Sequence, residues 1–279
     1  MSKVAFITGA SRGIGRETAL AFARAGYDLA ISARTLEEGE THAHALTDAE
    51  GRPLAGSLAS TAAAGRALGR EVLVLRMDLL DEASVRGAAA AVLAHYGQVD
   101  VLVNNAIYQG SDLNLPFMAL GGETLQRVFQ GYVMAPVVLT QCLLPAMIAR
   151  GGGTVINVTS GAGESDPPVA AGKGGWGYAY GAGKAAVSRL SGVLAAEFGE
   201  QGIRAFTINP GVVTTEALRA TIGDKGVLAM HKGVAPPEVP AAVMCWLATQ
   251  PEADRFQRRT VQAQAFALEH GVVPDWRNA

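Results

Sequence analysis

The chain has 279 residues, of which 49% are hydrophobic, and its 23 basic and 25 acidic residues give a formal net charge of −2. A chain of this length forms one large domain or two small ones and can bury a full core. The balanced charge excludes a protein that binds nucleic acid mainly through phosphates. Because no run of about 18 apolar residues and no signal-peptide layout appears, we expect a cytoplasmic protein without a membrane partner.

Residues that could carry redox or metal chemistry are sparse. Cys142 and Cys245 lie in apolar stretches without a pattern of paired ligands, so we expect buried free thiols. His42 and His44 are two residues apart at the start of a polar segment and would point to different sides of a helix, so we expect solvated surface residues. The sequence therefore predicts no metal site.

Short apolar runs alternate along the chain with longer alanine-rich segments of helical period, such as 121–149 and 179–200. Continuously apolar strands separated by helices imply a parallel sheet covered on both faces, and right-handed crossovers then give a doubly wound α/β fold. We therefore predict one domain over residues 1–279. The expected strands are 3–8, 27–33, 71–77, 99–103, 153–159 and 203–208.

Three segments, 35–70, 161–177 and 212–240, exceed ordinary connection lengths. The last two follow strand carboxyl ends, where such sheets bind ligands, so we expect them to shape a substrate pocket. Trp176 is a candidate wall of that pocket, although a surface flap is an equal alternative. The residues of 212–236 that would make a mobile apolar lid are Val212, Val213, Leu218, Ile222, Val227, Leu228 and Met230.

A glycine-rich turn, Thr-Gly-Ala-Ser-Arg-Gly-Ile-Gly at residues 8–15, joins the first expected strand to a helix. A helix N-terminus offers free N–H groups to a pyrophosphate, and glycines let the backbone come close. The spacing differs from the Gly-x-Gly-x-x-Gly of the usual dinucleotide fingerprint. Because any tight turn favours glycine, the turn alone leaves a purely structural role open.

This turn resembles that of the classical short-chain dehydrogenases/reductases, and the resemblance extends in order over about residues 3–216. It implies a Rossmann-like single domain that binds a nicotinamide cofactor. Five further motifs match those of the family: Asp78-Leu79, Asn104-Asn105-Ala106 with Ile107 in place of a glycine, Ser160, Tyr180 with Lys184, and Asn209-Pro210-Gly211 with Thr215.

The resemblance implies three catalytic residues, Ser160, Tyr180 and Lys184. Tyr180 would donate or accept the proton, and Ser160 would orient the carbonyl. Lys184 shares a helix face with Tyr180, so we expect it to lower the phenol pKa from about 10 and to hold the cofactor ribose. Tyr178 is a weaker rival, because Ala182 stands where its lysine would be. The implied cofactor-binding residues are Gly9, Ser11, Arg12, Gly13, Ile14, Gly15, Arg34, Asp78, Leu79, Asn104, Ala106, Tyr180, Lys184, Pro210, Gly211, Val213 and Thr215.

The type of nicotinamide cofactor follows from charge at the end of the second expected strand. NAD-specific members carry an acid there for the ribose hydroxyls, whereas this chain has Ala33 followed by Arg34. Arg12 lies inside the glycine turn, and two guanidiniums can hold a 2′-phosphate by charge-assisted hydrogen bonds. We therefore expect NADP(H).

Two departures from the family pattern stand out. Many members complete a tetrad with a helical asparagine that holds a water molecule, and matching Ala135-Pro136 to that segment places Tyr132 there, so the proton relay differs. Residues 262–279 lack the family's glycine-rich end and could cover the pocket or contact another subunit.

Together these features predict an NADP(H)-dependent oxidoreductase that interconverts a ketone or aldehyde of hydrophobic body and an alcohol. The resemblance also implies a homodimer or homotetramer, although the alanine-rich helices suit burial within one chain equally well. The alternatives are a 3-oxoacyl carrier-protein reductase and, from a different class, a cofactor-binding sensor or scaffold with degraded catalysis.

Overall fold

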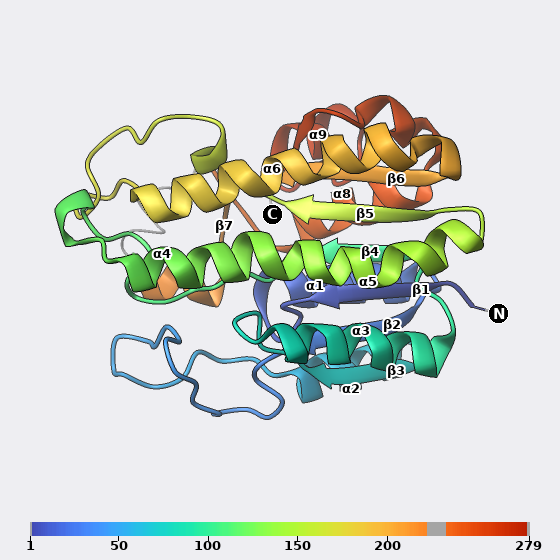
Figure 1. The fold of residues 1–279 in the computed structure, drawn as a ribbon, viewed down its shortest axis with the longest axis horizontal. Coiled ribbons are helices and arrows are strands. Elements are labelled where there is room, and N and C mark those ends of the chain that lie inside the picture. The colour runs from blue at the N-terminus through green and yellow to red at the C-terminus, as the bar shows by residue number, and fades with distance from the viewer. Residues whose placement is uncertain (1, 222–232, 278–279) are drawn as a thin grey trace.

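The protein is described by a computed structural model that covers residues 2–221 and 233–277. Its centre is a parallel sheet in the order β3-β2-β1-β4-β5-β6-β9 (Figure 1). The chain reverses its direction of strand addition between β1 and β4, which makes the carboxyl edge there the ligand-binding edge of such folds. The strands are β1 (Val4–Thr8), β2 (Asp28–Ala33), β3 (Val72–Arg76), β4 (Val101–Asn104), β5 (Gly153–Val158), β6 (Ile203–Asn209) and β9 (Thr260–Gln262).

Helices cover both faces of the sheet. One face is covered by α3 (Glu82–Tyr96), α5 (Ala135–Ala149) and α6 (Tyr178–Phe198), and Figure 1 shows these in front of the strands. The opposite face carries α1 (Gly13–Arg24), α2 (Leu58–Ala67), α8 (Glu238–Thr249) and α9 (Ala263–Glu269). Smaller elements are the helical turns η1 (Phe117–Ala119), η3 (Gly161–Gly163), η4 (Gly199–Gln201) and η5 (Pro251–Phe256), and the strand pair β7 (Val212–Val213) and β8 (Val234–Ala235).

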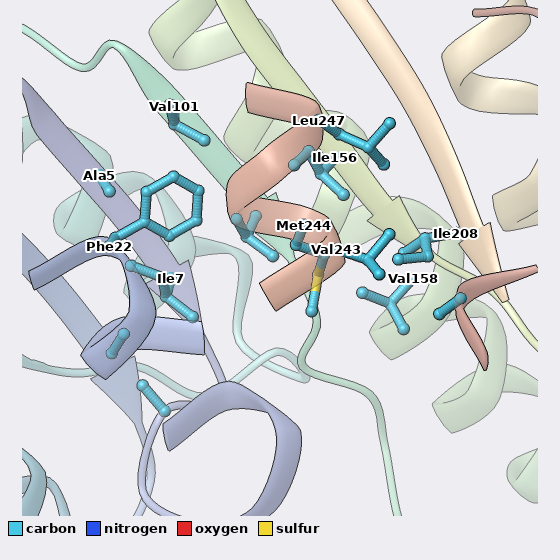
Figure 2. Close-up of a cluster of buried hydrophobic side chains, with 14 of the residues drawn as sticks. Ala5, Ile7, Phe22, Val101, Ile156, Val158, Ile208, Val243, Met244 and Leu247 are labelled. Carbon is cyan, nitrogen blue, oxygen red and sulfur yellow. The ribbon is translucent and has the colours of Figure 1, made fainter. Parts of the chain in front are cut away.

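The central strands are largely apolar because both of their faces are buried. Every residue of β1 and β4 is buried. On one face Ala5 and Ile7 pack against Phe22 of α1, and Val243 and Met244 of α8 fill the space toward β5 (Figure 2). Burying a Phe, Ile or Val side chain stabilises a fold by about 1.5–3 kcal/mol, so this layer holds the switch between β1 and β4 rigid.

The six predicted strands and the doubly wound fold are confirmed, with shifts of one or two residues at their ends. Strand β9 was not predicted, because its three residues form a sheet edge and carry no recognisable alternation. The prediction of one long connection over 35–70 is wrong in part. Ser57 starts α2 with a reciprocal capping box to Ser60, so only residues 35–57 are irregular.

The predicted helix 121–149 is interrupted at its centre. It consists of α4 (Gly122–Phe129), a π-helical turn η2 (Gln130–Met134) and α5. Together residues Gly122–Ala149 are long and apolar enough, by length and composition, to cross a membrane. Half of the most apolar stretch is buried, and Val138, Leu139 and Leu143 lie in the core against α3 and β5, as expected for a core helix of a layered fold.

Candidate active site

The turn between β1 and α1 requires glycine at defined positions. Gly9 and Gly13 have φ of +70° and +53°, in the left-handed region that other residues rarely adopt. At Gly15 an added Cβ would overlap the carbonyl oxygen of Gly9. The turn therefore brings bare backbone together at the carboxyl edge of the sheet, as predicted.

The side chain of Asn105, after β4, holds this turn in place. Its amide donates to the carbonyl of Thr8 at 2.9 Å, and the Thr8 hydroxyl accepts from the backbone N–H groups of Asn105 and Ala106 at 3.1 and 3.0 Å. The backbone N–H of Gly9 donates to Ser32 at 2.7 Å. Asn105 was not among the predicted site residues, and only the pairing of β1 with β4 reveals its role.

The N-terminus of α1 is open to an anion. Arg12 is the N-cap residue, but no side chain caps the helix and its first turn holds no acidic residue. A Cβ on Gly13 would stand 3.1 Å from the Thr215 methyl group and 3.5 Å from Oε2 of Glu216. That oxygen is buried and has no hydrogen-bond partner among the described residues. The structure thus brings Thr215 to the glycine turn, and it adds a carboxylate that the sequence did not indicate.

Arg12 and Arg34 lie close enough for their charges to interact. Each donates to a neutral carbonyl of the segment 35–57: Arg12 to Gly56 at 2.9 Å and Arg34 to Ala43 at 2.8 Å. Burial lowers the pKa of Arg12, while Glu216 and Glu38 act in the opposite direction. Within residues 2–221 and 233–277 neither guanidinium forms an ion pair, so both keep their charge available.

The remaining predicted cofactor-binding residues differ in how far their side chains are already engaged in contacts within the protein. The carboxylate of Asp78 accepts from the N–H of Leu80 at 3.0 Å, and Leu79 is half-buried beside it. The Asn104 side chain turns into the core and donates to Asn157 at 2.9 Å, so only its backbone faces the edge. Ser11 is buried in the turn and Ile14 packs partly against the core.

Tyr180, Lys184 and Ser160 come together between α6 and the end of β5. The Ser160 hydroxyl lies near that of Tyr180, close enough to act on the pKa of the phenol. Lys184 is 3% exposed and its Nζ donates to the carbonyl of Val158 at 2.8 Å. The three predicted catalytic side chains therefore form one cluster at the carboxyl edge.

Burial dominates the ionisation of this cluster. It raises the pKa of Tyr180 above its usual value, against the smaller lowering effect of the nearby Ser160 hydroxyl. It lowers the pKa of Lys184 to about 7. The expectation that Lys184 lowers the phenol pKa is wrong for this structure, because desolvation penalises both charged forms.

Tyr132 lies against this cluster from the π-helical turn η2. Its ring is 5.4 Å from Nζ of Lys184 and meets the Tyr180 ring edge-on at 6.1 Å. Its hydroxyl is buried without a partner among the described residues. A Cβ on Gly183 would come within 2.9 Å of the Tyr132 ring, so α6 packs closely here.

The segment 161–177 contacts the segment after β4 beside the first turn of α6. The N–H of Gly177 donates to Asn114 at 3.0 Å, and Trp176 lies near Gly181, half-buried. Tyr178 is 58% exposed and touches the ring of Phe117, which is 71% exposed. These residues form an apolar rim at the first turn of α6.

Gln264 of α9 fixes the predicted Pro-Gly segment. Its amide donates to the carbonyls of Pro210 and Val212 at 3.2 and 2.8 Å, and Gly211, with φ of +71°, leaves no space for a side chain beside it. Val213 lies in β7, paired with Ala235 of β8. Four of the predicted lid residues, Ile222, Val227, Leu228 and Met230, lie outside the described residues.

Outside this cluster the structure corrects one expectation. Cys142 and Cys245 are free, but both are only partly buried. In the part of the chain that the structure describes, no three His, Cys, Asp or Glu side chains are grouped to hold a metal ion.

Comparisons with known proteins agree with the fold and the motifs. The sequence model described as short chain dehydrogenase matches residues 3–56 and 54–225. The short chain dehydrogenase mpl6 of Monascus purpureus is 32% identical over 247 residues, 88% of this chain and 75% of its own length.

Solved structures superpose over almost the whole chain. A 7α-hydroxysteroid dehydrogenase in complex with NADH and 7-oxo glycochenodeoxycholic acid has a TM-score of 0.75 and 27% identity, covering 93% of this chain and 92% of that one. A short chain dehydrogenase from Mycobacterium paratuberculosis bound to NAD has a TM-score of 0.76 and 26% identity, covering 94% and 96%.

Proposed function

Since the chain belongs to the short chain dehydrogenase family, whose members are oxidoreductases that use a nicotinamide cofactor, we propose that it is an NADP(H)-dependent carbonyl reductase. Its substrate is a ketone or aldehyde with an apolar body, and Tyr180 exchanges the proton. The observation that carries this proposal is the grouping of Tyr180 and Ser160 beside the buried Lys184.

The residues present suit the pyrophosphate of a dinucleotide. The uncapped N-terminus of α1 presents N–H groups, and the glycines at positions 9, 13 and 15 keep the approach free of side chains. Thr215 closes the other side of this cradle. Lys184 would hold the ribose next to the reacting groups, as the family resemblance implies.

Charge favours NADP(H) over NAD(H). The two solved structures described above hold NADH or NAD, so family membership does not decide between the cofactors. Arg12 and Arg34 are near each other and bound only to neutral carbonyls, and Ala33 provides no carboxylate for ribose hydroxyls. A 2′-phosphate would gain two charge-assisted partners in this arrangement.

The ionisation state of the cluster suits reduction of a carbonyl. When bound, the nicotinamide cofactor supplies the hydride. The raised pKa of Tyr180 keeps its phenol protonated at neutral pH, and a protonated phenol is the donor that a developing alkoxide requires. Ser160 lies close to Tyr180, so both hydroxyls can converge on one substrate oxygen.

An apolar substrate body fits the rim. Trp176, Tyr178 and Phe117 lie at the first turn of α6, and large exposed apolar side chains mark contact sites. We further propose that one domain carries the whole site and that the protein acts in the cytoplasm as a homo-oligomer. No particular observation favours the carrier-protein reductase or the sensor.

The deciding experiment replaces Tyr180 with phenylalanine. We expect Tyr180→Phe to keep its affinity for NADPH and to lose about 10²- to 10⁴-fold in turnover, the usual contribution of general acid catalysis. The measurement is NADPH oxidation with a panel of hydrophobic ketones, alongside fluorescence titration of the cofactor. Tyr178→Phe is the matched control and should retain most activity. Full turnover in Tyr180→Phe would exclude the assigned mechanism, and NADPH binding without reduction of any ketone by the unaltered protein would favour the sensor.

A further inference from the structure

Lys184 is a buried amine with few polar partners. Its Nζ donates to the Val158 carbonyl at 2.8 Å, which leaves two of its three hydrogens to be satisfied otherwise. The side chain is 3% exposed, and no charged group in the described residues acts on its ionisation. A buried ammonium in such surroundings loses its charge unless another group stabilises it.

The group that faces this amine is the ring of Tyr132. The ring centroid is 5.4 Å from Nζ, within the range in which an aromatic face attracts an ammonium. Tyr132 is 1% exposed, and its hydroxyl has no hydrogen-bond partner among the described residues. The hydroxyl therefore does not explain why a tyrosine is buried at this position, which leaves the contact between its ring and Lys184 as the explanation.

Close packing on two sides fixes the position of that ring. The π-helical turn η2 places Tyr132 toward α6, where Gly183 leaves room for it, and the Tyr180 ring meets it edge-on at 6.1 Å. A Cβ on Gly131 would come within 2.8 Å of Tyr108 on the other side. The ring cannot turn away from Lys184 without displacing these neighbours.

We propose that Tyr132 is a positioning residue whose ring face holds the protonated amine of Lys184 by a cation–π contact. The proposal rests on the proposed function in one respect, namely that Lys184 must be charged to serve Tyr180 and the cofactor ribose. The ionisable groups around the amine are Tyr132 from η2 and Tyr180 from α6, with Tyr108 packed behind Tyr132. Tyr108 in turn bonds Asp112, which is paired with Arg127, so these two charges offset each other.

The test measures the ionisation of Lys184 in the protein without added cofactor. The sequence has only five lysines, so ¹³Cε-lysine NMR resolves them, and the Lys184 signal is the one lost in Lys184→Met. Tyr132→Phe keeps the ring and removes the unpartnered hydroxyl, and we expect its Lys184 titration to match that of the unaltered protein. Tyr132→Leu removes the ring at similar apolar volume and should weaken proton binding by Lys184 about 3- to 30-fold.

A second substitution keeps the proposal testable if Tyr132→Leu does not fold. Pentafluorophenylalanine at position 132 keeps the shape of phenylalanine but withdraws charge from the ring face, and it should weaken proton binding by Lys184 in the same direction. An unchanged or higher proton affinity in either variant, with Tyr132→Phe unchanged, would overturn the proposal, as would a Tyr132→Phe titration shifted as far as that of Tyr132→Leu.

Activity provides an independent reading. If carbonyl reduction is observed, its loss at high pH should begin at lower pH in Tyr132→Leu than in Tyr132→Phe, by the same factor as in the NMR titration. If it is not observed, the proposed function fails while the NMR titration still decides the role of Tyr132.

Discussion

The two halves of the candidate site are built by opposite means. From the β1–α1 turn to Arg34, the dinucleotide half consists of bare backbone at Gly9 and Gly15 and of guanidiniums held by neutral carbonyls. The reacting half consists of the partly buried Tyr180 and the buried Lys184, whose pKa values are shifted by desolvation. The first half offers open backbone and positive charge to a dinucleotide, whereas the second half costs folding free energy because it removes the amine of Lys184 from water.

The largest expected effect concerns the cost of the reacting half. In the unfolded chain a lysine has a pKa of about 10.4, whereas burial lowers that of Lys184 to about 7. Between these values the unfolded state binds more protons, so the free energy of unfolding rises with pH across this window. Lys184→Met lacks this dependence and should gain stability relative to the unaltered protein toward low pH.

Between pH 6 and pH 10 the difference in unfolding free energy between these two proteins should change by roughly 3–5 kcal/mol. Urea unfolding at several pH values measures it, and Lys173→Met, which replaces an exposed lysine, is the matched control. If the free energy of unfolding depends on pH in the same way for Lys184→Met and the unaltered protein, burial of Lys184 does not cost folding free energy, and the two halves do not differ as described.

The next effect concerns charge in the dinucleotide half. Arg34→Ala removes one of two guanidiniums available to a 2′-phosphate, and losing its charge-assisted hydrogen bonds should weaken NADPH binding by about 10- to 100-fold. Binding of NADH should hardly change. Fluorescence titration of both cofactors measures the two affinities, with Arg24→Ala, an exposed arginine of α1, as control. Equal affinities for the two cofactors in the unaltered protein, or equal losses in Arg34→Ala, would contradict the NADP(H) assignment.

The smallest effect is expected where the two halves meet. Glu216 lies shortly after β7, and its Oε2, which has no hydrogen-bond partner among the described residues, lies beside Gly13 at the N-terminus of α1. A carboxylate there repels a pyrophosphate, so Glu216→Gln should bind NADPH about two- to fivefold more tightly, with a larger gain at low salt. Glu200→Gln, a distant exposed carboxylate, corrects for net charge. Weaker binding in Glu216→Gln would mean that the carboxylate supports the site, for example by holding Arg12.

The elements and motifs that could be predicted from the sequence share one property: each can be recognised from residues that are close together in the chain. The strands show as continuous apolar runs because both faces are covered, and the glycine turn is local. The roles of Asn105, which lies within a matched motif, and of Gln264 could not be found in this way. Their partners are Thr8 and Pro210, and only strand pairing and the return of the chain through β9 bring them together.

Spacing also predicted the catalytic cluster but not its electrostatics. The four-residue interval between Tyr180 and Lys184 places both on one helix face, and the structure brings them to Ser160. The sign of the tyrosine pKa displacement was wrong, because burial depends on what α4, η2 and β5 pack around the helix. Tyr132 illustrates the same limit: its position could be flagged from the sequence, whereas its contact with the amine required the π-helical turn.

The hydrogen bonds from Gln264 to the carbonyls of Pro210 and Val212 have a consequence for recombination between relatives. The match to the family ends at residue 225, so Gln264 lies in the part of the chain beyond it. A chimera joined after residue 225 would keep the predicted catalytic residues Ser160, Tyr180 and Lys184. It would take the residue at position 264, and with it the hydrogen bonds to the segment after β6, from the other parent. Exchanging the segment that carries α9 between such enzymes is therefore expected to shift residues 210–212, so a graft should take the segment before Thr215 and α9 from the same parent.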